Sequence, residues 1–474
     1  MSTVGRDFLR FDDEYDICPA SLADRSAPEQ RPVLHNAARN YYAVFRHEDV
    51  IQVLRDHDLW TSVTGCGPVL IEPREQFFLM GVDPPRHTDE RRLVTESFPP
   101  SAVASIGART EQLVLELLEG LFARGEADLI EDFARLVPLH AFCWTIGAPV
   151  EDLPQLRLWA RGVAQGVWPD LDEETMQRAS TARAATEAYG VDLATTRQRA
   201  LEFGQPVPDD LTTRLLSAAI PPEIIGFTYV RLLSAATHTT TWLIGNLIYR
   251  LLTNPDQLAL LQADHSLVEA AVEESLRYDP PVRGFYRTST EPTTLHGVEI
   301  TADTKVWPSL LGANHDPQVW EMPEKFDITR PIEKLRDHCS FGYGVHRCLG
   351  APVARLQGQI ALRFLLKKLP NLRLNGEPMP SRYCRAGMGL DHLPVAWDVP
   401  ETAPSPADAG AATRVDRPLE PSPSPERLSA GRRTFGLWIE HNLDRSIGEP
   451  DEDRMQRRRQ GGPVVWRQYR AEGD

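Results

Sequence analysis

A ten-residue segment in the last third of the chain constrains the fold more than any other feature. The segment from Phe341 to Gly350 contains two glycines that permit a tight turn, then a histidine, an arginine and Cys348. Residues 351–369 follow with a helical pattern, so Cys348 should lie at a helix N-terminus, where free N–H groups and the dipole favour a thiolate. A thiolate is a good axial ligand for haem iron, and its electron donation favours O–O cleavage. The alternative is a buried structural cysteine, but so many residue types at fixed offsets favour the haem interpretation.

The segment resembles the haem-binding loop of the cytochrome P450 family, the haem-thiolate monooxygenases. The family pattern is F-G-x-G-x-H-x-C-x-G, and every fixed position is present, from Phe341 and Gly342 through His346 to Cys348. The resemblance implies a mainly α fold, in which a large helical domain carries a small β-rich region. It also implies haem b (iron protoporphyrin IX), with Cys348 as the axial ligand of the iron, and one haem domain over residues 1–400.

Hydrophobic periodicity predicts helices along most of this domain. The predicted ranges are 48–56, 86–98, 104–124, 129–146, 173–201, 222–252, 254–278 and 351–369. Asp279-Pro280-Pro281 ends the helix that precedes it. Turn signals at Gly297 and Asp303 predict short strands between positions 282 and 306. This order of elements agrees with the fold that the resemblance implies.

The overall composition is that of an ordinary globular protein, with 42% hydrophobic and 25% charged residues. A net charge of −16 argues against nucleic acid as a partner. Residues 1–16 resemble neither a signal peptide nor a membrane anchor, and no apolar run approaches the ~18 residues of a spanning helix. We therefore expect a cytoplasmic protein with no membrane partner. The six scattered cysteines form no C-x-x-C pair, which predicts free thiols in that compartment.

The composition changes near residue 400. Residues 401–425 are rich in Pro, Ser and Ala and predict a flexible linker, and residues 426–474 predict a largely disordered tail with one short helix candidate. This extension is absent from most bacterial relatives of the family. Its aromatic and arginine side chains could bind a partner, the enzyme's own surface or a carrier. The simpler interpretation, which we favour, is an inert extension.

A Glu-x-x-Arg motif precedes the haem-binding segment. Glu274 and Arg277 lie at i and i+3 on one helix face, a spacing that by itself is common and weakly informative. In the context of the resemblance, the pair matches a buried network behind the haem, and Arg330 matches its third member. We expect a structural role, because one buried charge without its partners would be costly.

Four basic residues match positions that hold the haem propionates in the family. His87 and Arg91 lie four residues apart on one helix face, Arg287 falls in the strand after the Glu-x-x-Arg helix, and His346 lies in the loop itself. Two propionates bring negative charge into a partly buried site, so convergent cations are physically required. Without Cys348, a solvated helix face would be the preferred interpretation of His87 and Arg91.

The oxygen-activation motif departs from the family pattern A-G-x-(D/E)-T-T. In the run from Ala235 to Thr240, Ala236 replaces the usual glycine and His238 the usual acid, while Thr239 keeps the catalytic hydroxyl position. His238 could relay protons near neutral pH, or it could point away while Thr239 and water do this work. A third alternative is chemistry shifted towards radical coupling, nitration or use of peroxide.

The resemblance also places a substrate pocket at loops and at the long helix. The predicted lining residues are Phe77, Phe78, Trp168, Leu232, Ala235, Ala236, Val282, Arg283 and Phe285. Arg283 is unusual in such a strand. It could pair with an anionic group of the substrate, or it could be a surface arginine.

We therefore expect a monomeric monooxygenase that inserts one oxygen atom from O2 into a small or carrier-bound organic substrate, in specialised metabolism. Electrons should come from NAD(P)H through a separate ferredoxin reductase and ferredoxin, since no redox module is visible. An acidic ferredoxin could dock near Cys348 through Arg347, Arg355, Lys367 and Lys368. The alternatives are a non-hydroxylating oxidation on the same scaffold, and a non-catalytic haem protein or protein-recruiting scaffold.

Overall fold

The computed structural model of the chain describes residues 32–36, 40–67, 78–96, 98–165, 172–381 and 387–399. The predicted linker and tail, over residues 401–474, lie outside these ranges. So do two residues predicted to line the pocket, Phe77 and Trp168. The predicted domain boundary at residue 400 therefore stays a prediction.

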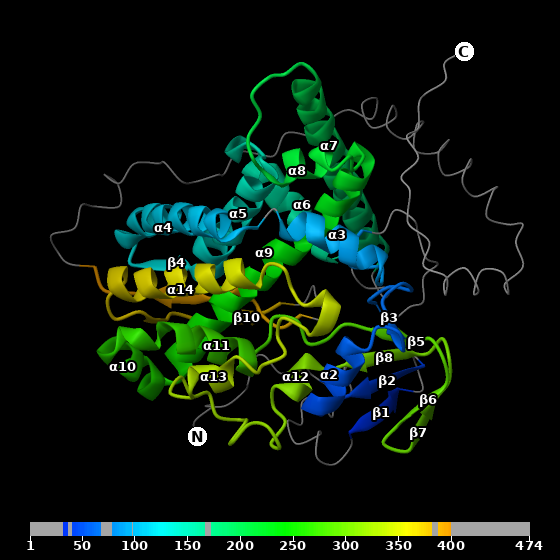
Figure 1. The fold of residues 1–474 in the computed structure, drawn as a ribbon. Coiled ribbons are helices and arrows are strands. Elements are labelled where there is room, and N and C mark those ends of the chain that lie inside the picture. The colour runs from blue at the N-terminus through cyan, green and yellow to red at the C-terminus, as the bar shows by residue number, and fades with distance from the viewer. Residues whose placement is uncertain are drawn as a thin grey trace, which may run out of the picture.

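Helices form the larger part of the described molecule (Figure 1). They are α2 (His47–Arg55), α3 (Arg86–Thr95), α4 (Pro100–Phe122), α5 (Leu136–Ile146), α6 (Leu153–Gln165), α7 (Glu173–Glu202), α8 (Leu211–Ser217), α9 (Pro222–Thr253), α10 (Pro255–Ala263), α11 (Val268–Tyr278), α12 (Leu310–Ala313), α13 (Ile332–Leu335) and α14 (Ala351–Lys368). The mainly α class expected from the sequence is confirmed.

The largest sheet and the β6–β7 pair gather at one end of the molecule, beside α2 and α12, whereas β4 and β10 lie among the helices (Figure 1). A five-stranded sheet has the order β1 (Val33–Asn36), β2 (Tyr41–Val44), β8 (Lys305–Pro308), β5 (Arg287–Ser289) and β3 (Trp60–Thr61), and only β2 and β8 pair in parallel. Smaller sheets join β4 (Glu126–Asp128), β12 (Pro394–Ala396) and β9 (Arg373–Leu374), then β10 (Met379–Pro380) with β11 (Leu390–His392), and β6 (Thr293–Leu295) with β7 (Val298–Ile300).

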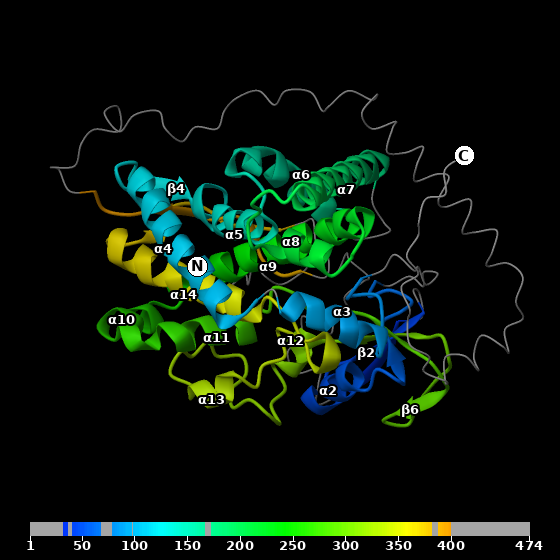
Figure 2. The same cartoon turned by 45° about the horizontal axis from the view of Figure 1, so that its top comes forward.

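The 32-residue helix α9 crosses the middle of the molecule, with α6 and α7 on one side and α11 and α14 on the other (Figures 1 and 2). Its backbone comes very close to that of α7, because a Cβ at Gly226 would lie 2.6 Å from the carbonyl oxygen of Glu187. Two hydrophobic clusters meet at α9, one built around α11 and α14 and the other around α5 and α6. A straight helix of about 48 Å thus links both halves of the core.

Some predicted elements differ from the structure. The single helix predicted over residues 254–278 is two helices, α10 and α11, separated by a short turn that Asp264 caps by accepting from the Ser266 N–H at 2.9 Å. The segment predicted over 129–146 begins with a π-helical turn (Ile130–Ala134) before α5. Helices α6 and α8 and most of the short strands were not predicted from the sequence. Among the described helices, none has the length and apolar character of a membrane span.

Candidate active site

The segment around Cys348 forms a tight loop that leads into α14. Gly342 and Gly344 have φ values of +67° and +70°, a region that glycine adopts without strain. A Cβ at Gly344 would also lie 2.4 Å from the carbonyl oxygen of Leu54. The loop closes on itself where the Cys348 N–H donates to the Phe341 carbonyl at 2.8 Å. The two glycines therefore fix the path that brings Cys348 to the start of α14.

The sulfur of Cys348 accepts hydrogen bonds from the backbone N–H groups of Gly350 and Ala351. Cys348 as a residue is exposed to solvent, but many protein atoms lie close to its sulfur. Burial raises the pKa of the Cys348 thiol, while these N–H groups and the guanidinium groups of Arg91 and Arg355 act in the opposite direction. The local field therefore favours a thiolate as soon as a cationic metal compensates the cost of burial.

The structure brings together the four basic residues predicted to bind propionates. The rings of His87 and His346 lie 4.2 Å apart, and both side chains are largely buried. The Arg91 guanidinium donates to the backbone carbonyl of Arg347, directly before Cys348. Burial lowers the pKa of His87 to about 4, with further lowering by His346 and Arg91.

Two imidazole nitrogens in this group are buried without a hydrogen-bond partner: His87 Nδ1 and His346 Nε2. The nearest carboxylate, Asp83, lies 3.7 Å from His346 Nε2, which is too long for a hydrogen bond. Arg287, 6% exposed, donates to the neighbouring Tyr286 carbonyl at 3.0 Å, and burial lowers its pKa. The cluster therefore offers positive charge and unused donors to an anionic ligand.

An accessible strip interrupts the otherwise buried middle of α9. Ala235 and Ala236 are exposed there, Leu232 and Thr239 are partly exposed, and their spacing places all four on one helix face. The Thr239 hydroxyl donates to the Ala235 carbonyl at 2.7 Å. Leu232 and Leu349, the residue after Cys348, pack against the same hydrophobic cluster. The strip and the cysteine loop therefore border one region of the structure.

His238 does not share this face. Its ring is 9% exposed and lies on the opposite side of α9, beside Trp242 and a group of arginines. Burial lowers its pKa to about 4, helped by Arg135 and Arg161 and opposed by a hydrogen bond to the Ser234 carbonyl. The neutral imidazole therefore matches the second of the two sequence interpretations, in which His238 points away from the reaction site.

The Glu-x-x-Arg pair lies in the core with no exposed surface on either side chain. Arg277 Nε and Nη2 donate to the two carboxylate oxygens of Glu274 at 2.7 and 2.8 Å, and the guanidinium also reaches three backbone carbonyls. Arg330 Nε lies 3.5 Å from Glu274 Oε1. The three residues predicted to form a network therefore lie together and connect α11 to the segment before α13.

A second buried network, which the sequence analysis missed, lies directly behind the cysteine loop. Arg355 Nε and Nη2 donate to Glu273 at 2.6 and 2.8 Å, and His338 Nε2 lies 3.0 Å from the same carboxylate. The Arg355 guanidinium also lies 4.5 Å from the ring centroid of Phe341. The charge of Arg355 is therefore paired within the protein, and its place on a ferredoxin-docking surface stays a prediction. Two adjacent acidic residues, Glu273 and Glu274, are the sequence feature that could have predicted two separate networks.

The network gives a prediction for the pH dependence of stability. Burial alone would raise the pKa of Glu273, but hydrogen bonds from His338 and Arg355 outweigh burial and hold the pKa at about 2. A depressed pKa adds stability above the ordinary value near 4.5, and this contribution is lost as the pH falls towards 2. We expect Glu273→Gln to lower the free energy of unfolding by about 1–3 kcal/mol at neutral pH, a difference that shrinks below pH ~4.5. Urea titrations of both proteins at several pH values measure it, and a pH-independent gap would contradict this account.

The remaining predicted pocket residues lie in two places, Phe78 in the cluster against which Leu232 packs and residues 282–285 in the segment before β5. Phe78 is buried in the cluster around α5 and α6, and Phe285 is 37% exposed. Val282 is partly exposed and bridges to Gly387. Arg283 is 3% exposed, so the alternative of a surface arginine is wrong.

The residues present fit a haem. A sulfur that already accepts two N–H groups suits an axial iron ligand, and the two unpaired imidazole nitrogens beside Arg91 and Arg287 suit two propionates. The small side chains of Ala235 and Ala236 leave the exposed face of α9 free for a flat ligand.

Comparison with known proteins decides the family. The family model "Cytochrome P450" matches residues 171–395. The chain is 34% identical over 412 residues to cytochrome P450 107B1 of Saccharopolyspora erythraea, which covers 82% of this chain and 97% of the relative. The chain belongs to the cytochrome P450 family. Its fold is similar to that of P450BioI in complex with a hexadec-9Z-enoic acid ligated acyl carrier protein, with a TM-score of 0.72, 28% identity and coverage of 80% and 98% of the two chains.

As a cytochrome P450, the protein is a monooxygenase, and its family implies haem. A further relative is the mycinamicin IV hydroxylase/epoxidase of Micromonospora griseorubida, 33% identical over 372 residues and covering 75% of this chain and 89% of the relative. The sequence-derived recognition of the family is thereby confirmed.

Proposed function

We propose that the protein hydroxylates a C–H bond of a small organic substrate in specialised metabolism. The observation that carries the proposal is the placement of Cys348, with its N–H-bonded sulfur, in the same region as the Thr239 strip of α9. Relatives described as hydroxylases or epoxidases support this reaction type.

Each residue group would have a separate task in this reaction. Bound haem supplies the redox chemistry that activates O2. Cys348 would hold the iron, and His87, Arg91, Arg287 and His346 would hold the propionates. The Thr239 hydroxyl would position water and donate protons on the α9 side, while the two alanines would leave room for the substrate.

A second candidate follows from Ala236 and His238, which depart from the family pattern. His238 stands where the family pattern has a carboxylate. Because its imidazole lies on the far face of α9, it delivers no proton to the Thr239 side. The missing carboxylate favours a non-hydroxylating oxidation, such as radical coupling, nitration or peroxide-driven chemistry, as the second candidate. A non-catalytic haem protein is the remaining alternative.

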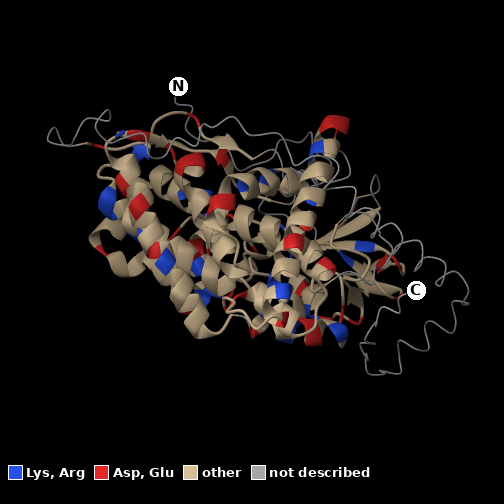
Figure 3. Ribbon diagram, turned by 90° about the horizontal axis from the view of Figure 1, so that it is seen from above, with Lys and Arg blue, Asp and Glu red and all other residues tan. Residues whose placement is uncertain are grey.

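Bacterial members of the family usually receive electrons from a ferredoxin and its reductase. We propose the same partners here, with NAD(P)H as the electron source, a cytoplasmic location where NAD(P)H is present, and a monomeric enzyme. Arg347 and Lys367 are exposed and remain available for docking, whereas Lys368 lies 4.0 Å from Glu119. Charges of both signs are interspersed over the described helices, so docking would depend on this local group (Figure 3). A carrier-bound substrate is a further possibility, since P450BioI binds an acyl carrier protein.

The proposed function is tested with purified holoprotein, NADPH and a surrogate ferredoxin and reductase. Compounds that shift the spin state of the iron are chosen as substrates and incubated under 18O2. We expect a product that gains one labelled oxygen atom. Coupled or nitrated products without the label would favour the second candidate, and no turnover of any spin-shifting compound would favour the non-catalytic one.

The Thr239 hydroxyl gives a prediction for coupling. Thr239→Ala should increase the fraction of electrons lost as hydrogen peroxide several-fold, because the donor near the reacting oxygen is removed. Thr241→Ala is a matched control: its hydroxyl donates to the carbonyl four residues earlier at 2.8 Å, as that of Thr239 does at 2.7 Å, but it lies on the far face of α9. Equal peroxide yields from the two variants would remove Thr239 from the mechanism.

A further inference from the structure

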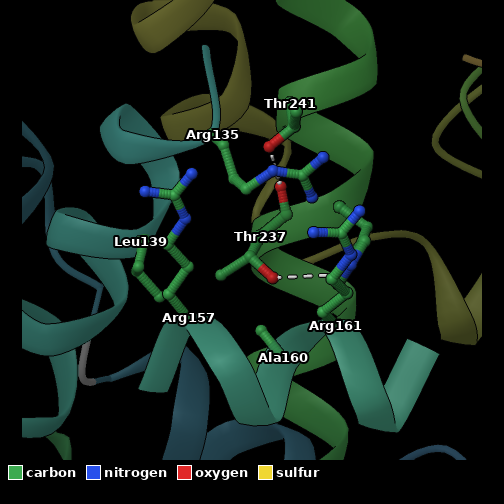
Figure 4. A pocket seen from close by; sticks show the side chains of 8 residues that line it. Arg135, Leu139, Arg157, Ala160, Arg161, Thr237 and Thr241 are labelled. Carbon is green, nitrogen blue, oxygen red and sulfur yellow. Dashed lines mark hydrogen bonds between the residues drawn. The ribbon is translucent and has the colours of Figure 1, made fainter. Parts of the chain in front are cut away.

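A small pocket lies on the side of α9 opposite the Thr239 strip. It is bounded by α9, by α6 and by α5 with the residue that precedes it (Figure 4). Its lining residues are Arg135, Leu139, Arg157, Ala160, Arg161, Thr237, His238 and Thr241. The space between them is on the scale of one water molecule or one monatomic ion.

The pocket carries an excess of positive charge. Arg135 Nη2 lies 3.1 Å from Glu131 Oε1, and Arg157 donates to the second oxygen of the same carboxylate. Within the described ranges, Arg161 has no carboxylate partner within ion-pair distance, and Glu131 is the single acid paired with the other two arginines. Three guanidinium groups thus face one carboxylate, and of the three Arg135 is buried, Arg157 is partly exposed and Arg161 is exposed to solvent.

One donor in the wall of the pocket lacks an acceptor. Arg135 is 9% exposed, and its Nε has no hydrogen-bond partner. A buried donor left unpaired costs about 1–3 kcal/mol, and Arg135, the one buried arginine of the three, is a charge that a nearby anion stabilises. Both features point to a ligand that accepts hydrogen bonds and carries negative charge.

The residue at position 238 explains why the protein supplies only one carboxylate to the three arginines. The family pattern has an acid here, whereas His238 places a ring with a pKa of about 4, neutral at physiological pH, against the arginines. Glu131 alone therefore supplies negative charge to the three guanidinium groups.

We propose that this pocket binds a small inorganic anion of the size of chloride, which links Arg135 and the two arginines of α6 to α9. The anion would take the place of the missing carboxylate at position 238. Because α6 contributes two of the ligands, binding would hold α6 against α9. The proposal does not depend on the substrate or on the reaction type.

The test measures the melting temperature of the holoprotein in potassium chloride and in potassium gluconate at equal ionic strength. We expect chloride to raise the melting temperature by about 1–3 °C at roughly ten times its dissociation constant. Arg161→Gln should raise the chloride concentration needed for the same rise in melting temperature by about tenfold, since it removes one positive charge that binds the anion. His238→Asp should abolish it, because the new carboxylate replaces the anion.

Arg336→Gln is the control for loss of an arginine, since Arg336 pairs with Glu269 on the surface at α13. It should keep the full chloride effect. Crystals of the holoprotein soaked in bromide should show an anomalous peak within hydrogen-bond distance of Arg135 Nε. Each of three results would overturn the proposal. The melting temperature could respond equally to both salts, the chloride effect could be unchanged in Arg161→Gln and His238→Asp, or bromide could bind only elsewhere. A bromide peak without chloride-specific stabilisation would mean binding at crystal concentration only and would also overturn it.

Discussion

Cys348→Ser should abolish monooxygenase activity and the spectrum of a thiolate-ligated haem. The serine hydroxyl is a poor electron donor to iron, and the loss of the thiolate push removes the driving force for O–O cleavage. We expect turnover to fall by at least about 1,000-fold, equivalent to about 4 kcal/mol of barrier. The reduced carbonyl adduct of the variant should absorb like that of a protein without a sulfur ligand.

The matched control is Cys339→Ser, two residues before the Phe341–Gly350 segment. Cys339 is 1% exposed and packs in the cluster beside the sheet, so its replacement should reduce stability but keep the thiolate spectrum. If Cys348→Ser retained a thiolate-type carbonyl spectrum, or if the wild-type protein bound no haem, the assigned axial ligand would be wrong.

Arg277→Met should lower stability more than any other single substitution considered for this protein. The substitution leaves the Glu274 carboxylate buried without its bidentate partner and removes a donor from three backbone carbonyls, of which, among the described residues, only that of Lys325 keeps a second donor, from Arg330. Breaking such a pair costs about 3–5 kcal/mol, a large part of the total stability of a folded domain. We therefore expect a sharply reduced yield of holoprotein and an early transition in urea.

Two further variants separate charge from geometry. Arg277→Lys keeps the charge but loses the planar two-point contact, so it should recover only part of the stability. Arg336→Ala removes a surface arginine that pairs with Glu269, and it should change the free energy of unfolding by less than about 1 kcal/mol. Equal effects of the surface and core substitutions would show that the buried network has no special role.

The Phe341–Gly350 segment shows how much of the site could be predicted from the sequence. A tight turn that needs positive φ requires glycine, and a thiolate ligand requires cysteine, so short-range chemistry identified the loop and its helix. Helix α9 was equally predictable, since 32 residues between a starting proline and Asn254 contain no strong breaker. The split between α10 and α11 was not predicted, because the Asp264 side chain caps a new short turn between them, a local contact that periodicity does not detect.

The sequence by itself determined the family and the mainly helical class and predicted the cofactor ligand, since these depend on residue types at fixed spacing along the chain. Only the tertiary structure decided that His238 points away from Thr239, that Arg355 is bound by Glu273, and that three arginines meet behind α9. The physical reason is that each of these facts depends on which segments, far apart in the sequence, pack against the same helix face. Burial and charge pairing arise from that packing, and a linear pattern of residues does not contain it.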